Sequence, residues 1–239
     1  MEKVIIILRG TPGDEAWCAR LRTDVAQKLL DTGVPGLAIN VRDDVVSESL
    51  MTLTTLNPPV LALVSMWTDQ YYGEQVRTAT TLLSNVCDQV AAYLVTESVP
   101  LAPPHTEPGR RTPGFANVAL LRRPAELDEA TWLARWHDDH TQVAIDTQST
   151  FGYTQNAVVR ALTDDSPPIS AIVEELFPIE ATSDLHAFFG AADDADLNDR
   201  MARMVASTSA FGANRDIDTV PTSRYVLRAA FAPKATLQP

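Results

Sequence analysis

Two histidines near the middle of the chain have the spacing and surroundings that could support chemistry. His137 and His140 lie within residues 128–153, DEATWLARWHDDHTQVAIDTQSTFGY. On a helix with about 100° per residue, His140 shares an apolar stripe with Trp132 and Trp136, and His137 lies at the edge of that stripe. Burial of a polar ring costs free energy unless it is hydrogen-bonded, so His140 needs a partner or a chemical task.

His140 is the predicted catalytic residue. Its unperturbed pKa lies near neutrality, and burial in an aromatic pocket would shift that pKa modestly, which suits a general acid or base. Trp132 and Trp136 would supply flat apolar walls for an aromatic or polyketide-like ligand. The alternative is a core histidine bonded to a sheet residue such as Asn156, with both tryptophans as ordinary core.

Two expected strands, residues 152–160 and 169–176, supply the other candidates. Because side chains alternate across a strand, only one of Tyr153 and Asn156 can face the helix. Glu175 has the same ambiguity, and it would orient the imidazole or raise its pKa if it faced the pocket. The predicted ligand-contacting residues are Trp132, Trp136, His137, Tyr153, Asn156 and Glu175.

The run HDDH also suggests a metal site, which we do not predict. A divalent ion needs three or four converging ligands. On a helix, Asp138 and Asp139 point away from the two histidines, and the sequence has no second His/Cys cluster. The sequence also lacks a Gly-rich phosphate loop after a strand, so neither a metal nor another cofactor is expected.

The overall charge excludes one class of partner. The 239 residues carry a formal charge of −12, which repels phosphate backbones, so nucleic acid is not an expected ligand. The N-terminal apolar run is far shorter than a membrane span or a signal peptide, and Cys18 and Cys87 cannot form a disulfide framework. We therefore expect a soluble cytoplasmic protein with no membrane contact.

The chain divides into two halves of similar pattern. In the first half, strands are expected at residues 3–8, 36–42, 60–67 and 91–96, and helices from residue 12 and over 71–88. In the second half, strands are expected at 115–121, 152–160, 169–176 and 223–228, and helices over 128–147 and 184–210. The predicted boundaries are a degenerate first half at 1–100, a Pro- and Gly-rich linker at 101–114, a second half at 115–230 and a tail at 231–239.

The two halves can be aligned with one another, which indicates an internal duplication. In this alignment Leu21 matches Trp136 and Val25 matches His140, so the folding unit does not need an imidazole there. Two βαββαβ units predict two ferredoxin-like halves, and burial of both bare sheet faces predicts a single α+β barrel of pseudo-dimeric form. We expect one substantial pocket, beside the second-half helix, and a first-half cleft closed by side chains.

The second half resembles the EthD domain. The resemblance rests on RRP at 122–124, on WHDDH at 136–140 and on FGYTQNAVV at 151–159. It implies a dimeric α+β barrel with the histidine in a cleft between helix and sheet. The family often has Pro or a small residue directly after the histidine, whereas Thr141 and Gln142 follow His140 here.

The resemblance implies chemistry without a metal or flavin, as in relatives that act as dehydratases or decarboxylases. We expect a cofactor-independent lyase, dehydratase, decarboxylase or isomerase acting on a hydrophobic small molecule through His140. A non-catalytic barrel that sequesters such a molecule is the alternative. A third option is a haem- or oxygen-using enzyme, because related barrels hold haem by a helix histidine. A homodimer is possible, although the duplication already covers the sheet faces.

Overall fold

The computed structural model of the chain describes residues 1–231. The predicted tail at 231–239 therefore lies outside the described residues from position 232 onward. Among the helices of the described part, none is long and apolar enough to cross a membrane.

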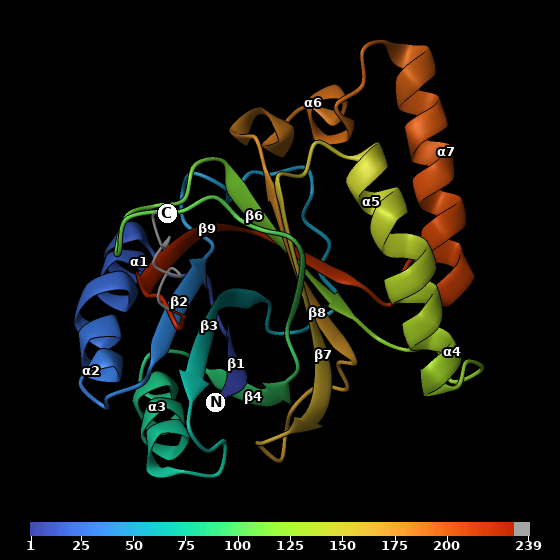
Figure 1. Cartoon of the computed structure of the whole chain (residues 1–239). Coiled ribbons are helices and arrows are strands. Elements are labelled where there is room, and N and C mark those ends of the chain that lie inside the picture. The colour runs from blue at the N-terminus through green and yellow to red at the C-terminus, as the bar shows by residue number, and fades with distance from the viewer. Residues whose placement is uncertain (232–239) are drawn as a thin grey trace, which may run out of the picture.

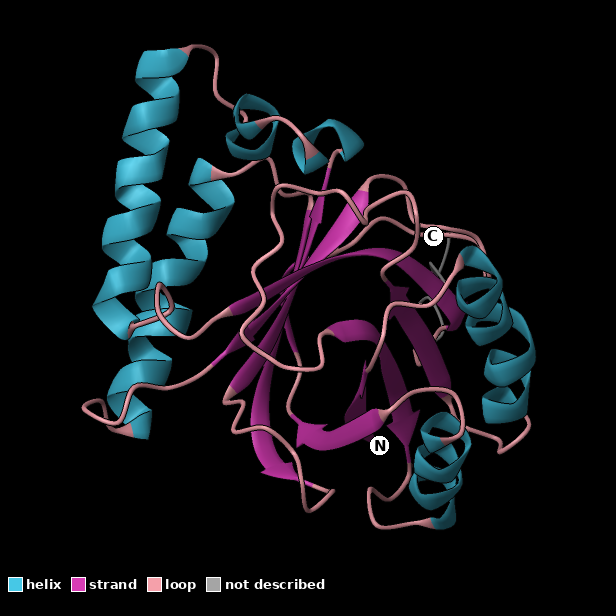
Figure 2. Ribbon diagram, turned by 180° about the vertical axis from the view of Figure 1, so that it is seen from behind, coloured by secondary structure: helices cyan, strands magenta, loops and turns pink. Residues whose placement is uncertain are grey.

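Eight antiparallel strands form a closed barrel (Figures 1 and 2). The first half supplies β1 (Glu2–Arg9), β2 (Gly36–Val41), β3 (Val60–Thr68) and β4 (Gln89–Val95), and the second supplies β6 (Phe115–Leu121), β7 (Gly152–Ala161), β8 (Ala171–Phe177) and β9 (Asp218–Arg228). The strand order is β4-β1-β3-β2 in one half and β9-β6-β8-β7 in the other. Both are the ferredoxin-like order, so the predicted fold class is confirmed.

The two sheets join edge to edge. β2 pairs with β9, and β4 pairs with β7, so each half contributes both of its edge strands to the junctions. Hydrogen bonding at both junctions removes the free edges that an open four-strand sheet would expose. The barrel interior holds an apolar cluster with side chains from both halves, including Ile5, Ile7, Leu63, Tyr93, Leu120 and Ile172, beside polar side chains such as Asn40 and Asn156.

Helices cover the outside of the barrel on two opposite sides (Figure 2). The first half has α1 (Glu15–Arg20), η1 (Leu21–Val25), α2 (Ala26–Leu30) and α3 (Glu74–Ser84). The second half has α4 (Glu129–Ala134), η2 (Arg135–His140), α5 (Thr141–Thr147), η3 (Ile179–Thr182), α6 (Leu185–Phe189) and α7 (Asp194–Phe211). Each half has its own core between sheet and helices.

The long helix of each half starts at an aspartate and contains a π-helical turn. Asp14 accepts a hydrogen bond from the Trp17 amide at 2.8 Å, and Asp128 accepts one from the Thr131 amide at 2.9 Å. These caps satisfy amides that have no partner within the helix. The π turns, η1 and η2, follow at matching places, which supports the alignment of the two halves.

Several expected elements differ in detail. A short strand, β5 (Ser98–Leu101), lies at the end of the first half and pairs with β7 as a ninth strand. The expected helix over 184–210 is two helices, because Gly190 ends α6 with φ of 60° and Asp193 caps α7. The expected helix over 71–88 is shorter, since α3 spans Glu74–Ser84.

The connection between β2 and β3 crosses from the first half onto the second. Leu50 donates its amide to the Thr182 carbonyl at 2.8 Å, and Leu53 forms an isolated β-bridge with Thr219 of β9. Asp218, at the start of β9, accepts the amides of Thr55 at 2.6 Å and Leu56 at 3.0 Å. This segment of the first half is therefore anchored against the second-half sheet.

Candidate active site

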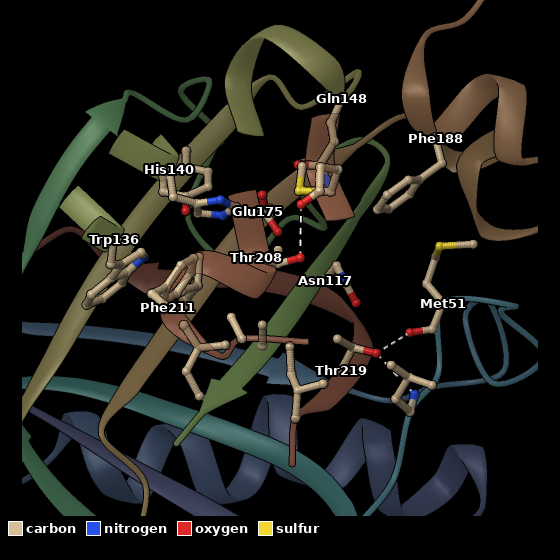
Figure 3. Close-up of a pocket in the computed structure, with 18 of the residues that line it drawn as sticks. Met51, Asn117, Trp136, His140, Gln148, Glu175, Phe188, Thr208, Phe211 and Thr219 are labelled. Carbon is tan, nitrogen blue, oxygen red and sulfur yellow. Dashed lines mark hydrogen bonds between the residues drawn. The ribbon is translucent and has the colours of Figure 1, made fainter. Parts of the chain in front are cut away.

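A cavity of about 380 Å³ lies between the outer face of the second-half sheet and its helices. Its walls come from β6, β7, β8 and β9, from η2, α6 and α7, and from the segment between β2 and β3 (Figure 3). Most of the lining is apolar, including Leu50, Met51, Leu53, Leu121, Val173, Phe188, Met204, Phe211 and Ile217. This size and composition are typical of a site for a small hydrophobic ligand.

The π turn η2 places its aromatic side chains against the sheet. Both Trp136 and His140 are buried, and both line the cavity. Such turns are frequent at functional sites, because one extra residue per turn re-aims the side chains that follow. Below them, Trp132 donates its indole N–H to the Phe211 carbonyl at 3.1 Å, which ties the helix to the end of α7.

His140 sits between two side chains of α7. Its Nδ1 is 2.9 Å from Ser207 Oγ, and its ring centroid is 4.9 Å from that of Phe211. Burial lowers the pKa of His140 to about 4, because the cationic form loses its solvation. The imidazole is therefore neutral at physiological pH.

Glu175 of β8 faces the same cavity. Burial raises the pKa of this carboxyl to about 8, so it is mainly protonated at neutral pH. Tyr153 lies opposite it on β7, and burial followed by the Glu175 charge raises the pKa of the phenol. Figure 3 shows Glu175 and His140 extending into the cavity from the sheet and from the helix.

Two carboxamides add further polar groups to the wall, beside Thr208 and Thr219. Asn117 of β6 pairs directly with Glu175 of β8, so the two side chains share one face of the sheet. Asn117 Oδ1 and Gln148 Oε1 are buried and have no hydrogen-bond partner in the described protein. Both residues line the cavity (Figure 3).

Four of the sequence-predicted residues come together at this cavity. Trp136, His140, Tyr153 and Glu175 all line it. The sequence left open which face of the sheet each of these strand side chains occupies. In the structure Tyr153 faces the helices, while Asn156 faces the barrel interior.

The other three predicted residues, Trp132, His137 and Asn156, do not line the cavity. Trp132 is buried in the core beside Trp136, at 5.3 Å between ring centroids. His137 is half-buried and packs against Trp136, at 4.4 Å between ring centroids. Asn156 donates to the Ile172 carbonyl at 2.9 Å inside the barrel, so it is not the partner of His140 either.

Sequence reasoning missed three contributions to the site. These are Asn117, the α7 side chains such as Phe211, and the first-half side chains such as Met51. A signal for Asn117 was present in the alignment of the halves. The strand pair Asn117–Glu175 corresponds to Val4–Met66, which are paired in the same way between β1 and β3.

The first half has hydrocarbon at every one of these positions. The counterparts of Asn117, Trp136, His140, Tyr153 and Glu175 are Val4, Leu21, Val25, Leu37 and Met66, and all five belong to the first-half core. These five differences therefore separate a packed apolar core in one half from a mainly apolar cavity with a few polar groups in the other.

The fold and the cavity define the class of protein. The chain has the dimeric α+β barrel fold, with both halves of the barrel in one polypeptide. The described residues hold no cluster of three or more His, Cys, Asp or Glu that could bind a metal ion.

Solved structures share this fold at low sequence identity. An anthrone oxidase-like protein aligns with a TM-score of 0.56 and 9% identity, over 97% of this chain and 95% of that chain. A candidate monooxygenase from Lactobacillus acidophilus NCFM has a TM-score of 0.48 and 8% identity, covering 95% and 97% of the two chains. A mutant chlorite dismutase from Candidatus Nitrospira defluvii has a TM-score of 0.48 and 11% identity, covering 95% and 92%. Neither the known families nor the curated proteins contain a match to the sequence.

Proposed function

We propose that the second-half cavity is the active site of a cofactor-independent lyase or isomerase that moves protons on a hydrophobic small molecule. The observation behind this proposal is that His140 and Glu175 share one apolar cavity and are both uncharged at neutral pH. In this proposal His140 is the general base and Glu175 the general acid.

In the proposed step one proton is removed from the substrate and one is returned to it, and these two side chains carry out both transfers. The neutral imidazole accepts a proton from a substrate C–H, and the Glu175 carboxylic acid donates its proton to a substrate oxygen. The step leaves an imidazolium and a carboxylate, which attract one another strongly in a site of low dielectric. The carboxylate also raises the basicity of His140 as the reaction proceeds, which offsets the low pKa of the resting imidazole.

The EthD resemblance enters the same proposal. Trp136, His140 and Tyr153, which belong to the segments that carry the resemblance, all line the cavity. We infer an EthD-like site that acts on a flat, hydrophobic, aromatic or polyketide-like compound, because Trp136 and Phe211 supply broad apolar walls.

The test is proton exchange on a model ketone. Anthrone and β-tetralone have acidic C–H groups beside a carbonyl, and proton NMR in heavy water follows the loss of those signals. We expect the wild-type protein to catalyse this exchange, His140→Ala to abolish it, and the exposed-site control His105→Ala to leave it unchanged. Binding of both ketones without exchange would favour a sequestering, non-catalytic barrel instead.

The haem-using alternative fits the cavity poorly. A volume of about 380 Å³ lies near the lower end of the range for small-molecule sites, and Phe211 packs on the His140 ring. A Soret band in the purified protein would contradict this view. The possible homodimer also stays a prediction, which light scattering on the 26.1 kDa chain would decide.

A further inference from the structure

Asn117 is buried at the cavity wall with an unused hydrogen-bonding atom. Its side chain is only 5% exposed, and no protein group pairs with its Oδ1 among the described residues. An unpaired buried carbonyl oxygen costs about 1–3 kcal/mol, so a group that donates a hydrogen bond to it would be stabilised there. Gln148 Oε1, at the same cavity, is a second unpaired acceptor.

The residue across the strand pair has the complementary property. Glu175 lies directly opposite Asn117, and burial keeps its carboxyl mainly protonated at neutral pH. A carboxylic acid donates a hydrogen bond, whereas Asn117 Oδ1 accepts one. Side by side on one face of the sheet, the two residues offer one donor and one acceptor (Figure 3).

We propose that Asn117 and Glu175 form a subsite for a hydroxyl group on the hydrophobic ligand. The hydroxyl donates to Asn117 Oδ1 and accepts from the Glu175 carboxylic acid. This inference rests on the proposed function, because it takes the cavity as the ligand site, and it narrows the substrate class to hydroxylated hydrophobic compounds.

Other ligand groups fit this pair less well. A ketone or ether oxygen only accepts, so it would leave Asn117 Oδ1 unpaired. A carboxylate would need a cation, and among residues 1–231 no Lys or Arg lines the cavity. An ammonium group would need an ionised partner, whereas the apolar surroundings disfavour ionisation of Glu175.

The proposed subsite also assigns a role within the reaction. A hydroxyl held by Glu175 receives the proton of that carboxyl as its C–O bond breaks and leaves as water. His140 removes the proton from the neighbouring carbon, and the electron pair of that C–H bond forms the new C=C bond. The subsite therefore favours elimination of water among the reactions open to this site.

The experiment compares three bicyclic probes of similar shape. Naphthalene tests the apolar cavity alone, β-methoxynaphthalene adds an oxygen that only accepts, and β-naphthol adds a hydroxyl that also donates. Dissociation constants come from calorimetry or from quenching of the buried Trp136. We expect β-naphthol to bind about tenfold more tightly than β-methoxynaphthalene, which corresponds to one satisfied buried acceptor.

The variant Asn117→Val tests the residue itself. Valine stands at the matching position, Val4, in the first-half core, so the fold accepts it. In this variant we expect the preference for β-naphthol over β-methoxynaphthalene to fall to about twofold or less, with naphthalene binding retained. Asn214→Val, at an exposed position, is the matched control and should keep the wild-type preference.

The outcomes separate the two proposals. Failure of all three probes to bind the wild-type protein would overturn the ligand site itself, and both proposals with it. Binding of naphthalene with equal affinity for the two oxygenated probes would overturn the hydroxyl subsite alone. A preference that survives Asn117→Val would do the same. The wild-type comparison needs no variant, so it decides the question even if Asn117→Val does not fold.

Discussion

Glu175 of β8 lies directly opposite Asn117 of β6, and both side chains face the cavity. At the equivalent strand pair of the first half, Met66 of β3 lies opposite Val4 of β1, and both are packed in the core. The same backbone position therefore serves as hydrocarbon core in one half and as polar cavity wall in the other. The two halves therefore differ at the candidate site in side chains carried by equivalent strand pairs.

Replacement of His140 by its first-half counterpart should separate activity from folding. His140→Val removes the bond to Ser207 but restores a side chain that the same framework accepts at Val25. We expect a loss of unfolding free energy of about 1 kcal/mol and a loss of exchange activity of roughly 10²- to 10⁴-fold. Urea unfolding and NMR exchange measure the two quantities, and His105→Val is the control. A destabilisation above about 3 kcal/mol would mark His140 as structural.

Glu175 should make the protein less stable as pH rises. Its pKa is about 8 in the folded chain against 4.5 ordinarily, so the folded state retains a proton that the unfolded state releases. The stability it contributes is complete below pH 4.5 and is lost as pH rises through 8. In Glu175→Gln we expect this decline to disappear from urea midpoints measured across that window. A wild-type decline that persists in Glu175→Gln would assign it to other groups.

His140 should make the protein less stable as pH falls into the acid range. Its pKa is about 4 in the folded chain against 6.5 ordinarily, so its contribution to stability is present above pH 6.5 and is lost as pH falls through 4.

Catalysis needs neutral His140 and protonated Glu175, so the plot of kcat/KM for exchange against pH should be bell-shaped, with limbs near pH 4 and 8. We expect Glu175→Gln to lack the alkaline limb. Activity that keeps rising above pH 8 would exclude Glu175 as the acid.

Asp218 should control the segment that closes the cavity from the first-half side. Burial acts to raise the pKa of this carboxyl, but hydrogen bonds from Thr55 and Leu56 and the 2.8 Å ion pair with Arg122 outweigh it, and the pKa is lowered. Asp218→Ala leaves Arg122 without its partner, so we expect a loss of about 3–5 kcal/mol.

The same substitution should loosen the anchored segment. We expect faster amide hydrogen exchange at residues 50–56 and weaker binding of naphthalene, because Leu50 and Leu53 line the cavity. The exposed-site control Asp165→Ala should change neither quantity. Unchanged exchange in Asp218→Ala would show that other contacts hold the segment.

Much of the fold was determined by the sequence itself. Continuous β-branched runs such as residues 3–8 are typical of buried strands. Helical spacing indicated both long helices, although the first begins at Glu15 after the Asp14 cap and not at residue 12. The repeated βαββαβ order indicated two ferredoxin-like halves, and the bare sheet faces indicated a barrel. Local patterns of hydrophobicity suffice for these conclusions, because they depend on residues close together in the chain.

The site needed the tertiary structure. Tyr153 and Glu175 face the helices because of the register of their strands, and this register is set by neighbouring strands that are distant in sequence. The partner of His140, Ser207, comes from α7, and Met51 reaches the cavity from the other half of the chain. No spacing along the sequence encodes such contacts, since they exist only after the strands have paired and the helices have packed. The aromatic stripe, the histidine and a pocket beside their helix could therefore be predicted from sequence, whereas the pairing of Asn117 with Glu175 in the pocket wall could not.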